Sequence, residues 1–270
     1  MIRPSPTLPR VQTLSTLIVI PARLSSTRLP RKILADIAGE PMIVHVWRQA
    51  ILSGCGGVLV ACGDREIADA IEAVGGNAVL TDPAHPSGSD RIAEAVELFD
   101  PAGHFQTIVN VQGDEPLIDP ANIRLAAYLA EFGPDTDMAT LGSPIRSDGD
   151  MDVASVVKAV VRIAEGVSNG SRHGTAVDFV RTRPDASLLS GTEHEVLHHV
   201  GLYAYRRSAL RKFVALPRSE REVDRSLEQM RALDNGMKIT IGCVAHGAFG
   251  VDTAEDLERA REIITSRMVA

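Results

Sequence analysis

The chain has 270 residues, a net charge of −7 and a charged share of 23%, which are values of an ordinary globular protein. This acidic balance argues against nucleic acid as a partner, because proteins that bind phosphate backbones carry a basic excess. The apolar share of 44% provides for a large core, so a disordered chain is not expected.

Residues 1–15, "MIRPSPTLPRVQTLS", are rich in proline and contain no hydrophobic signal core, which indicates a loose N-terminal extension. No apolar run approaches the length of a membrane span, so we expect no membrane insertion. Cys55, Cys62 and Cys243 show neither a metal-ligand spacing nor a disulfide framework, and we interpret them as small buried hydrophobes. These features together predict a cytoplasmic protein.

Short apolar runs and helical patterns alternate through the first half of the chain. The predicted strands are residues 16–20, 57–62, 77–80 and 107–111. The predicted helices are residues 41–52, 64–76 with Asp64 as cap, 91–99 opened by Ser89 or Asp90, and 119–133 with Asp119 as cap. Strands separated by helices indicate an α/β fold, a Rossmann-like, mostly parallel sheet with helices on both faces.

The second half of the chain has a less regular pattern. It predicts strands at residues 138–145, 156–163, 176–181, 198–206 and 237–244, and helices at residues 208–216, 221–236 and 253–264. We therefore expect one nucleotide-binding domain over residues 16–270, with an insertion at about 146–240. Ligands of such sheets bind at the carboxyl ends of the strands.

Four cations follow the first predicted strand in "IPARLSSTRLPRK", residues 20–32. They are Arg23, Arg28, Arg31 and Lys32. The stretch has no glycine-rich phosphate loop, so an anion there would be bound by guanidinium and ammonium groups. The alternative is a solvated basic turn, but the position after a buried strand favours a ligand site.

Two aspartates also stand at predicted strand ends. Asp114 follows the fourth strand in "NVQGDEPLI", and Asp252 precedes the last helix in "GVDTAEDL". Carboxylates placed in this way are natural ligands of Mg²⁺, which takes one or two of them together with substrate phosphates. The alternatives are a plain turn for Asp114 and a helix cap for Asp252. The sequence alone does not show that the two meet.

Two further stretches carry polar groups. In "HPSGSDR", Ser87 and Gly88 offer donors to an anion or a base edge, unless the loop only caps the next helix. In "HHVGLYAYR", a strand pattern places His199, Tyr203 and Tyr205 on one face. That polar face lines either solvent or a polar ligand.

These stretches, together with "DIAGEPMIVHV", "SLEQMRAL" and "GVDTAEDLERAR", resemble the cytidylyltransferases that activate 3-deoxy-manno-octulosonate (Kdo), the CMP-Kdo synthetases. They occur in the order of that family from about Leu17 onward. The resemblance implies a nucleotide-diphospho-sugar transferase type of fold. It also implies a homodimer that transfers CMP from CTP to an acidic sugar, with release of pyrophosphate, for lipopolysaccharide biosynthesis.

The resemblance also implies roles for single residues. It places around CTP the residues Ala22, Arg23, Arg28, Lys32, Ser87, Gly88, Arg91 and Gln112. It gives Asp114 and Asp252 to Mg²⁺, and with Arg23 and Lys32 these form the expected catalytic set. Around the sugar it places Arg181, His199, Tyr203, Glu228 and Gln229.

The chain departs from the family pattern at several positions. Arg31 stands where a glycine is usual, Gly63 stands where an acidic residue is common, and "AVDFVR" replaces "ALYFSR" after a polar insertion at residues 166–174. The sugar half is therefore altered, and a variant such as 8-amino-Kdo or another acidic sugar is an alternative substrate. Asp178 either pairs with the amine of such a sugar or lies on the surface.

Two other functions compete with this interpretation. A glycosyltransferase of related fold often carries an Asp-x-Asp metal motif, which "GDEP" is not. A nucleotide-binding protein that has lost turnover would bind CTP without activity on any octulosonate.

Overall fold

The computed structural model of the chain describes residues 15–26, 28–133, 135–164, 172–186, 194–247 and 249–269. The predicted N-terminal extension lies outside these residues, apart from Ser15. Most of the polar insertion predicted at 166–174 also lies outside them. Within the described part of the chain, no helix is long and apolar enough to cross a membrane.

The described strands form a nine-stranded sheet in the order β5-β4-β1-β6-β10-β7-β11-β9-β8. Its strands are β1 (Thr16–Ala22), β4 (Gly57–Cys62), β5 (Asn77–Leu80), β6 (Thr107–Asn110), β7 (Met138–Pro144), β8 (Lys158–Ile163), β9 (His173–Val180), β10 (His194–Arg206) and β11 (Ile239–Cys243). A separate hairpin contains β2 (Asp36–Ile37) and β3 (Glu40–Pro41).

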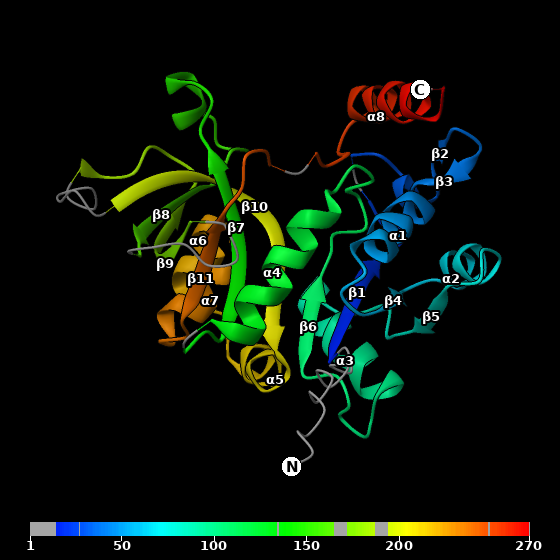
Figure 1. The fold of residues 1–270 in the computed structure, drawn as a ribbon, viewed down its shortest axis with the longest axis horizontal. Coiled ribbons are helices and arrows are strands. Elements are labelled where there is room, and N and C mark those ends of the chain that lie inside the picture. Colours follow the sequence, from blue (N-terminus) through cyan, green and yellow to red (C-terminus); the bar gives the residue numbers. More distant parts are fainter. Residues whose placement is uncertain are drawn as a thin grey trace, which may run out of the picture.

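The two halves of the sheet differ in strand direction. The strands β5, β4, β1 and β6 are parallel, as the alternating pattern predicts. The long strand β10 runs antiparallel to both β6 and β7. Its first residues also pair with β8, so that β10, β7, β11, β9 and β8 close into a ring of strands. The parallel half lies on the right of Figure 1 and the ring on the left.

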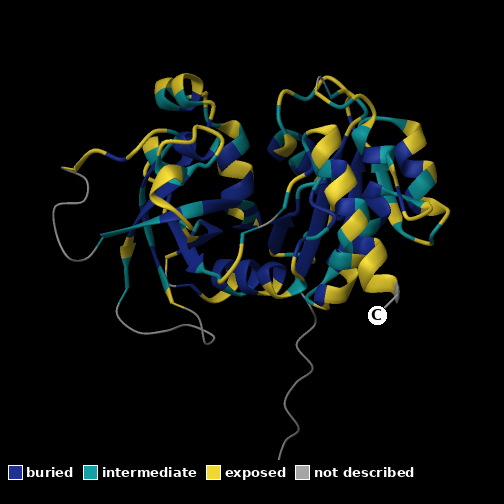
Figure 2. Cartoon of the chain, turned by 90° about the horizontal axis from the view of Figure 1, so that it is seen from above, coloured by how far each residue is buried: buried dark blue, intermediate teal, exposed yellow. Residues whose placement is uncertain are grey.

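Helices cover both faces of the sheet, as predicted. The helices are α1 (Met42–Ser53), α2 (Arg65–Glu72), α3 (Gly88–Phe99), α4 (Pro120–Phe132), α5 (Arg207–Ala215), α6 (Glu220–Arg225), α7 (Gln229–Asp234) and α8 (Ala254–Val269). One apolar core joins the sheet to α1, α2, α4 and α8, and a second joins it to α3, α5 and α7. Figure 2 shows the strands as buried residues enclosed by helices whose outer faces are exposed.

Three helix starts show how local sequence sets the element ends. Asp119 caps α4 by accepting a hydrogen bond from the amide of Ala121, as predicted. The cap of α3 is Ser87, two or three residues earlier than the predicted Ser89 or Asp90, because the Ser87 hydroxyl accepts from the Asp90 amide. At α8 the capping residue is Thr253, whose hydroxyl accepts from the Asp256 amide. Asp252 is therefore free for other contacts.

The single helix predicted over residues 221–236 is wrong, because α6 and α7 are separated by a turn. Ser226 adopts the left-handed conformation with φ 51°, and the buried Leu227 follows it. The carbonyl groups of Arg225 and Ser226 are released from helical bonding and accept from the Arg181 guanidinium at 2.7 and 3.0 Å. Hydrophobic spacing predicts helix content but not such a break, which depends on Arg181, the residue that follows the distant strand β9.

Candidate active site

A cavity of about 380 Å³ opens at the carboxyl ends of β1 and β6. All ten residues predicted to hold CTP and metal line it: Ala22, Arg23, Arg28, Lys32, Ser87, Gly88, Arg91, Gln112, Asp114 and Asp252. They come from four stretches that are far apart in the sequence. The structure therefore brings these side chains together, at the position where sheets of this type bind ligands.

The cation-bearing loop after β1 divides its charges between the cavity and the surface. Arg23, Arg28 and Lys32 line the cavity, whereas Arg31 lies outside it and forms an exposed ion pair with Glu66. The loop is fixed by Asp64, whose carboxylate accepts a hydrogen bond from the amide of Leu24 at 2.8 Å. Asp64 is the N-cap residue of α2, as predicted, but its carboxylate makes no capping hydrogen bond to that helix because it holds the loop instead.

Lys32 joins the two strand-end aspartates. Its ammonium group lies 2.6 Å from an Asp114 carboxylate oxygen and 3.0 Å from one of Asp252, and it also donates to the Val251 carbonyl at 3.0 Å. Partial burial lowers the pKa of Lys32, but the two carboxylates outweigh burial and raise the pKa above its ordinary value. Asp114 and Asp252 therefore meet across one cation, and the helix-cap alternative for Asp252 is wrong.

Arg91 lies on the opposite wall and is almost fully buried, with 2% of its surface exposed. One guanidinium nitrogen donates to the Thr81 hydroxyl, whereas Nη2 is buried and has no partner among the described residues. Burial, followed by the charge of Arg23, lowers the pKa of Arg91. A side chain at Gly63 would stand 3.0 Å from this guanidinium, so the glycine makes room for it. A buried donor without a partner beside a cavity is suited to bind a ligand acceptor.

Four of the five residues assigned to the sugar lie together beside the cavity. The rings of His199 and Tyr203 have centroids 5.5 Å apart, and the Tyr203 hydroxyl donates to the Gln229 side chain at 3.2 Å. Glu228 accepts from the Ser89 hydroxyl at 3.1 Å, which links this group to the start of α3. Burial raises the pKa of both Glu228 and Tyr203.

Arg181, the fifth residue assigned to the sugar, has backbone partners in this structure. Its guanidinium donates to the carbonyl of Ala154 as well as to those of Arg225 and Ser226. The side chain thereby holds the turn between α6 and α7, directly before Glu228. A role of Arg181 at a sugar remains a prediction.

Comparisons with known proteins agree with this geometry. Residues 17–239 match the family model described as cytidylyltransferase. The 3-deoxy-manno-octulosonate cytidylyltransferase of Paramagnetospirillum magneticum is 51% identical over 252 residues, which cover 93% of this chain and 98% of that protein. The enzyme of the same name from Rhodospirillum rubrum is 50% identical and covers 95% of this chain and 98% of its own length. This chain belongs to the 3-deoxy-manno-octulosonate cytidylyltransferase family.

Solved structures support the same family assignment. A CMP:2-keto-3-deoxy-manno-octonic acid synthetase in complex with CTP superposes with a TM-score of 0.80 at 34% identity, covering 93% of this chain and 99% of that one. A nucleotidyl transferase from Methanothermobacter thermautotrophicus, at 15% identity and a TM-score of 0.59, shares the fold alone. The Rossmann-like nucleotidyltransferase fold predicted from the sequence is confirmed.

One departure from the cytidylyltransferase pattern has a clear backbone basis. Arg31, which stands where the family resemblance places a glycine, has φ 57° in the left-handed region. An L-residue there costs about 1 kcal/mol that glycine avoids. The ion pair with Glu66 is exposed on both sides, so solvent screening leaves it little to offset this cost.

We therefore expect Arg31→Gly to leave the free energy of unfolding unchanged or to raise it by up to about 1 kcal/mol. Because Arg31 does not line the cavity, kcat/KM for CTP should not change. Urea unfolding and steady-state kinetics check both results. A loss of activity in this variant would place Arg31 in the site after all.

The hypotheses for Asp178 in the cytidylyltransferase are both wrong. Its carboxylate is buried, with 5% exposure, and lies 2.6 Å from Arg225 and 3.3 Å from Arg221. It also accepts a hydrogen bond from the Phe179 amide at 2.9 Å. The carboxylate therefore neither lies on the surface nor is free for a substrate amine.

Glu115, which follows Asp114 directly, has no role that its sequence pattern predicts. Glu115 is 7% exposed, and its Oε2 atom is buried without a partner among the described residues. Burial, followed by the nearby charge of Asp114, raises the pKa of Glu115 to about 8. The side chain is therefore a neutral acid at neutral pH, and a glutamine would reproduce its shape and charge.

Glu115 should make the stability of the enzyme depend on pH. Since the folded state holds its proton up to about pH 8, whereas the ordinary value is 4.5, the folded state binds more protons between these values. The contribution of Glu115 to the free energy of unfolding is therefore fully present below pH 4.5. It is lost as the pH rises through 8.

Glu115→Gln should remove that loss, so that the variant gains stability relative to the wild type between pH 5 and 9. Denaturant unfolding of both proteins at each pH measures the difference between their free energies of unfolding. The other titrating groups are the same in both proteins, so their contributions cancel in this difference. Parallel pH profiles would contradict the buried neutral state of Glu115.

Proposed function

We propose that this enzyme transfers CMP from CTP to the anomeric hydroxyl of Kdo, forming CMP-Kdo and pyrophosphate for lipopolysaccharide biosynthesis. The observation that carries the proposal is the cavity itself, which four cations and two carboxylates line together at the carboxyl ends of β1 and β6. The family membership of the chain and the names of its relatives support the same reaction.

The reaction joins two anions, a triphosphate and a sugar acid, and the cavity supplies the positive charge that this requires. Arg23, Arg28 and Lys32 would contact the triphosphate from the loop after β1. The hydroxyl oxygen of the sugar attacks the α-phosphorus, and the bond between that phosphorus and the oxygen bridging to the β-phosphate breaks. Pyrophosphate leaves with the electron pair of that bond, and the hydroxyl proton passes to water. Holding the two substrates in line and neutralising the charge lowers the barrier without a covalent nucleophile.

The cytidine would lie against the wall formed by Ser87, Gly88, Arg91 and Gln112. The partnerless Nη2 of Arg91 supports this assignment, because a ligand acceptor would satisfy it. Ser87 and Gly88 begin α3, where amide groups and the helix dipole favour an acceptor. The sugar would occupy the adjoining space beside His199, Tyr203, Glu228 and Gln229.

The donor set around Lys32 fits Mg²⁺. Two carboxylates and the Val251 carbonyl already surround one cation at 2.6–3.0 Å, and Mg²⁺ prefers such oxygen ligands. The described residues contain no group of three or more His, Cys, Asp or Glu side chains that could hold an ion alone. Asp114 and Asp252 would therefore hold Mg²⁺ together with substrate phosphates. When bound, the ion would supply positive charge to the phosphate oxygens.

We further propose that residues 16–270 act as one catalytic domain, that residues 146–240 serve the sugar and a homodimer interface, and that the enzyme works in the cytoplasm. The family resemblance supports the dimer, and the cytosolic substrate CTP supports the location. A variant sugar with an amine is not favoured, because Asp178 is already paired with two arginines.

Pyrophosphate release is the direct test. The purified chain should release pyrophosphate only when CTP, Mg²⁺ and Kdo are present together. ATP or GTP in place of CTP, and 8-amino-Kdo in place of Kdo, should give much lower rates. Binding of CTP without turnover on any octulosonate would contradict the proposed function.

A further inference from the structure

Strand β10 carries a bulge at the sugar side of the proposed site. Val200 pairs with Leu141 of β7, whereas the next pair joins Tyr203 to Thr140, so two residues of β10 have no opposite partner. In a regular strand, the Cα atoms of residues four apart are separated by about 13 Å, and their side chains stand roughly parallel to each other. The bulge brings the rings of His199 and Tyr203 to 5.5 Å instead.

Two side chains hold the carbonyl groups of this bulge. The Thr140 hydroxyl lies 3.0 Å from the Val200 carbonyl oxygen and 2.8 Å from that of Leu202. Gln112, from the wall of the cavity, donates to the Gly201 carbonyl at 3.2 Å. Thr140 is fully buried, so no water replaces a missing donor at these carbonyl groups. Its hydroxyl carries a single proton, which the two carbonyl groups that face it share.

The Thr140 oxygen has a third neighbour, the Nε2 atom of His199, at 2.9 Å. If the hydroxyl donated to Nε2, both carbonyl groups would face an oxygen lone pair in a buried setting, which is costly. The hydroxyl therefore donates to a carbonyl group and accepts from Nε2–H. Burial, followed by the nearby His198, lowers the pKa of His199 to about 3, so the ring carries one proton only.

This arrangement leaves Nδ1 as an acceptor. Among the described residues no hydrogen-bond partner of Nδ1 is found, and His199 keeps 8% exposure. The ring orientation is fixed by an edge contact with Phe179, at a centroid distance of 5.0 Å, and by the Tyr203 ring on its other side.

We propose that Thr140 is a positioning residue that holds neutral His199 as its Nε2–H tautomer, so that Nδ1 accepts a hydrogen bond from a hydroxyl of the sugar. This inference rests on the proposed function, since it assigns the geometry of the sugar side of that site.

The tautomer is measured first in the free wild-type protein. Protein labelled with ¹⁵N at histidine gives ¹⁵N–¹H correlations whose pattern separates the two neutral tautomers, and comparison with His199→Gln assigns the signal among the eight histidines. We expect the Nε2–H pattern. An Nδ1–H pattern for His199 would overturn the proposal without any need for a folded Thr140 variant.

Kinetics then test the consequence. Thr140→Val should disturb the Nε2–H pattern and raise KM for Kdo by roughly tenfold, with KM for CTP unchanged. Thr140→Ser keeps the hydroxyl, so it should show the wild-type Nε2–H pattern and the wild-type KM for Kdo. Thr240→Val is the matched control, because it removes a buried hydroxyl that bonds Thr136 at 2.8 Å, away from the site.

A Thr140→Val enzyme whose KM for Kdo equals that of Thr240→Val would overturn the role of Thr140. Failure of the proposed function is recognised separately, by the absence of pyrophosphate release in the wild type. An active wild-type enzyme with the Nδ1–H pattern would overturn only the inference about Thr140.

Discussion

Replacing Asp114 with asparagine is expected to lower kcat/KM for CMP transfer by roughly 10³-fold while the protein stays folded. The change removes one of the two carboxylates that meet at Lys32, at an atom 2.6 Å from its ammonium group. The backbone contact of the loop, in which the Asp114 carbonyl accepts from the Val251 amide, does not depend on the side chain. The midpoint of thermal unfolding should therefore change little.

The same variant tests the proposed metal site. If Asp114 and Asp252 hold Mg²⁺, Asp114→Asn should need a higher Mg²⁺ concentration for half-maximal activity than the wild type. Asp119→Asn is the matched control, because Asp119 lies five residues further along, only caps α4, and asparagine caps a helix equally well. Equal rates of pyrophosphate release in the two variants would remove Asp114 from the catalytic set.

That the proposed nucleotide residues line one cavity could be predicted in part from the sequence, because several of them directly follow strand ends. Parallel strands present their carboxyl ends on one edge, so Arg23, Gln112 and Asp114 are neighbours as soon as the strand order is known. The proximity of Asp114 and Asp252 could not be predicted from the sequence. Asp252 lies in the turn before α8, far along the chain from Asp114, and only the fold brings the two together.

The proposed sugar side could be predicted only in part, because its geometry depends on contacts between distant residues rather than on the periodicity of apolar residues. The bulge in β10 is set by Thr140 and Gln112, which lie on other strands or loops. The break between α6 and α7 depends on Arg181, and the pairing of Asp178 depends on Arg225. Patterns of apolar residues contain no information about such partners.

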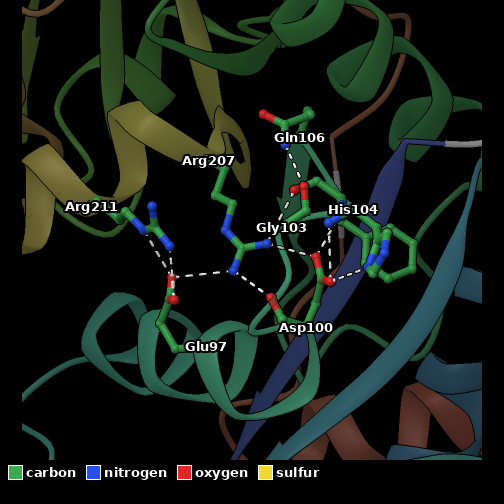
Figure 3. Close-up of polar contacts among 8 residues, drawn as sticks. Glu97, Asp100, Gly103, His104, Gln106, Arg207 and Arg211 are labelled. Carbon is green, nitrogen blue, oxygen red and sulfur yellow. Dashed lines mark hydrogen bonds and ion pairs between the residues drawn. The ribbon is translucent and has the colours of Figure 1, made fainter.

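Away from the cavity, Asp100→Asn is expected to lower the free energy of unfolding by about 3–5 kcal/mol. Asp100 and Arg207 form an ion pair at 2.6 Å with side-chain exposures of 3% and 4%. Figure 3 shows that the same carboxylate also accepts from His104, whose amide lies 3.0 Å away. An asparagine would turn an NH₂ group towards these donors and remove the carboxylate that lies 2.6 Å from the buried Arg207 charge. Arg207 would keep only the Asp100 and Phe105 carbonyl groups and the more distant Glu97 at 3.4 Å.

Glu97→Gln is the control, because Glu97 bridges Arg207 and Arg211 from the exposed side of the same cluster and should cost less than about 1 kcal/mol. Burial opposes the charge of Asp100, but backbone amides, His104 and Arg207 outweigh burial and lower its pKa below the ordinary 3.8. The stability that Asp100 contributes is therefore present above pH 3.8 and lost below it, so the difference between wild type and Asp100→Asn should narrow in acid.

The location of this ion pair links it to the active site without placing it there. Helix α3 begins at Gly88 in the cavity wall and ends at Phe99, where Asp100 fastens it to α5 through Arg207. Below its lowered unfolding temperature, Asp100→Asn should keep the wild-type KM for CTP, because Ser87 and Gly88 stay in position while α3 is folded. A raised KM at a temperature where the variant is fully folded would show instead that the ion pair sets the position of α3 in the cavity.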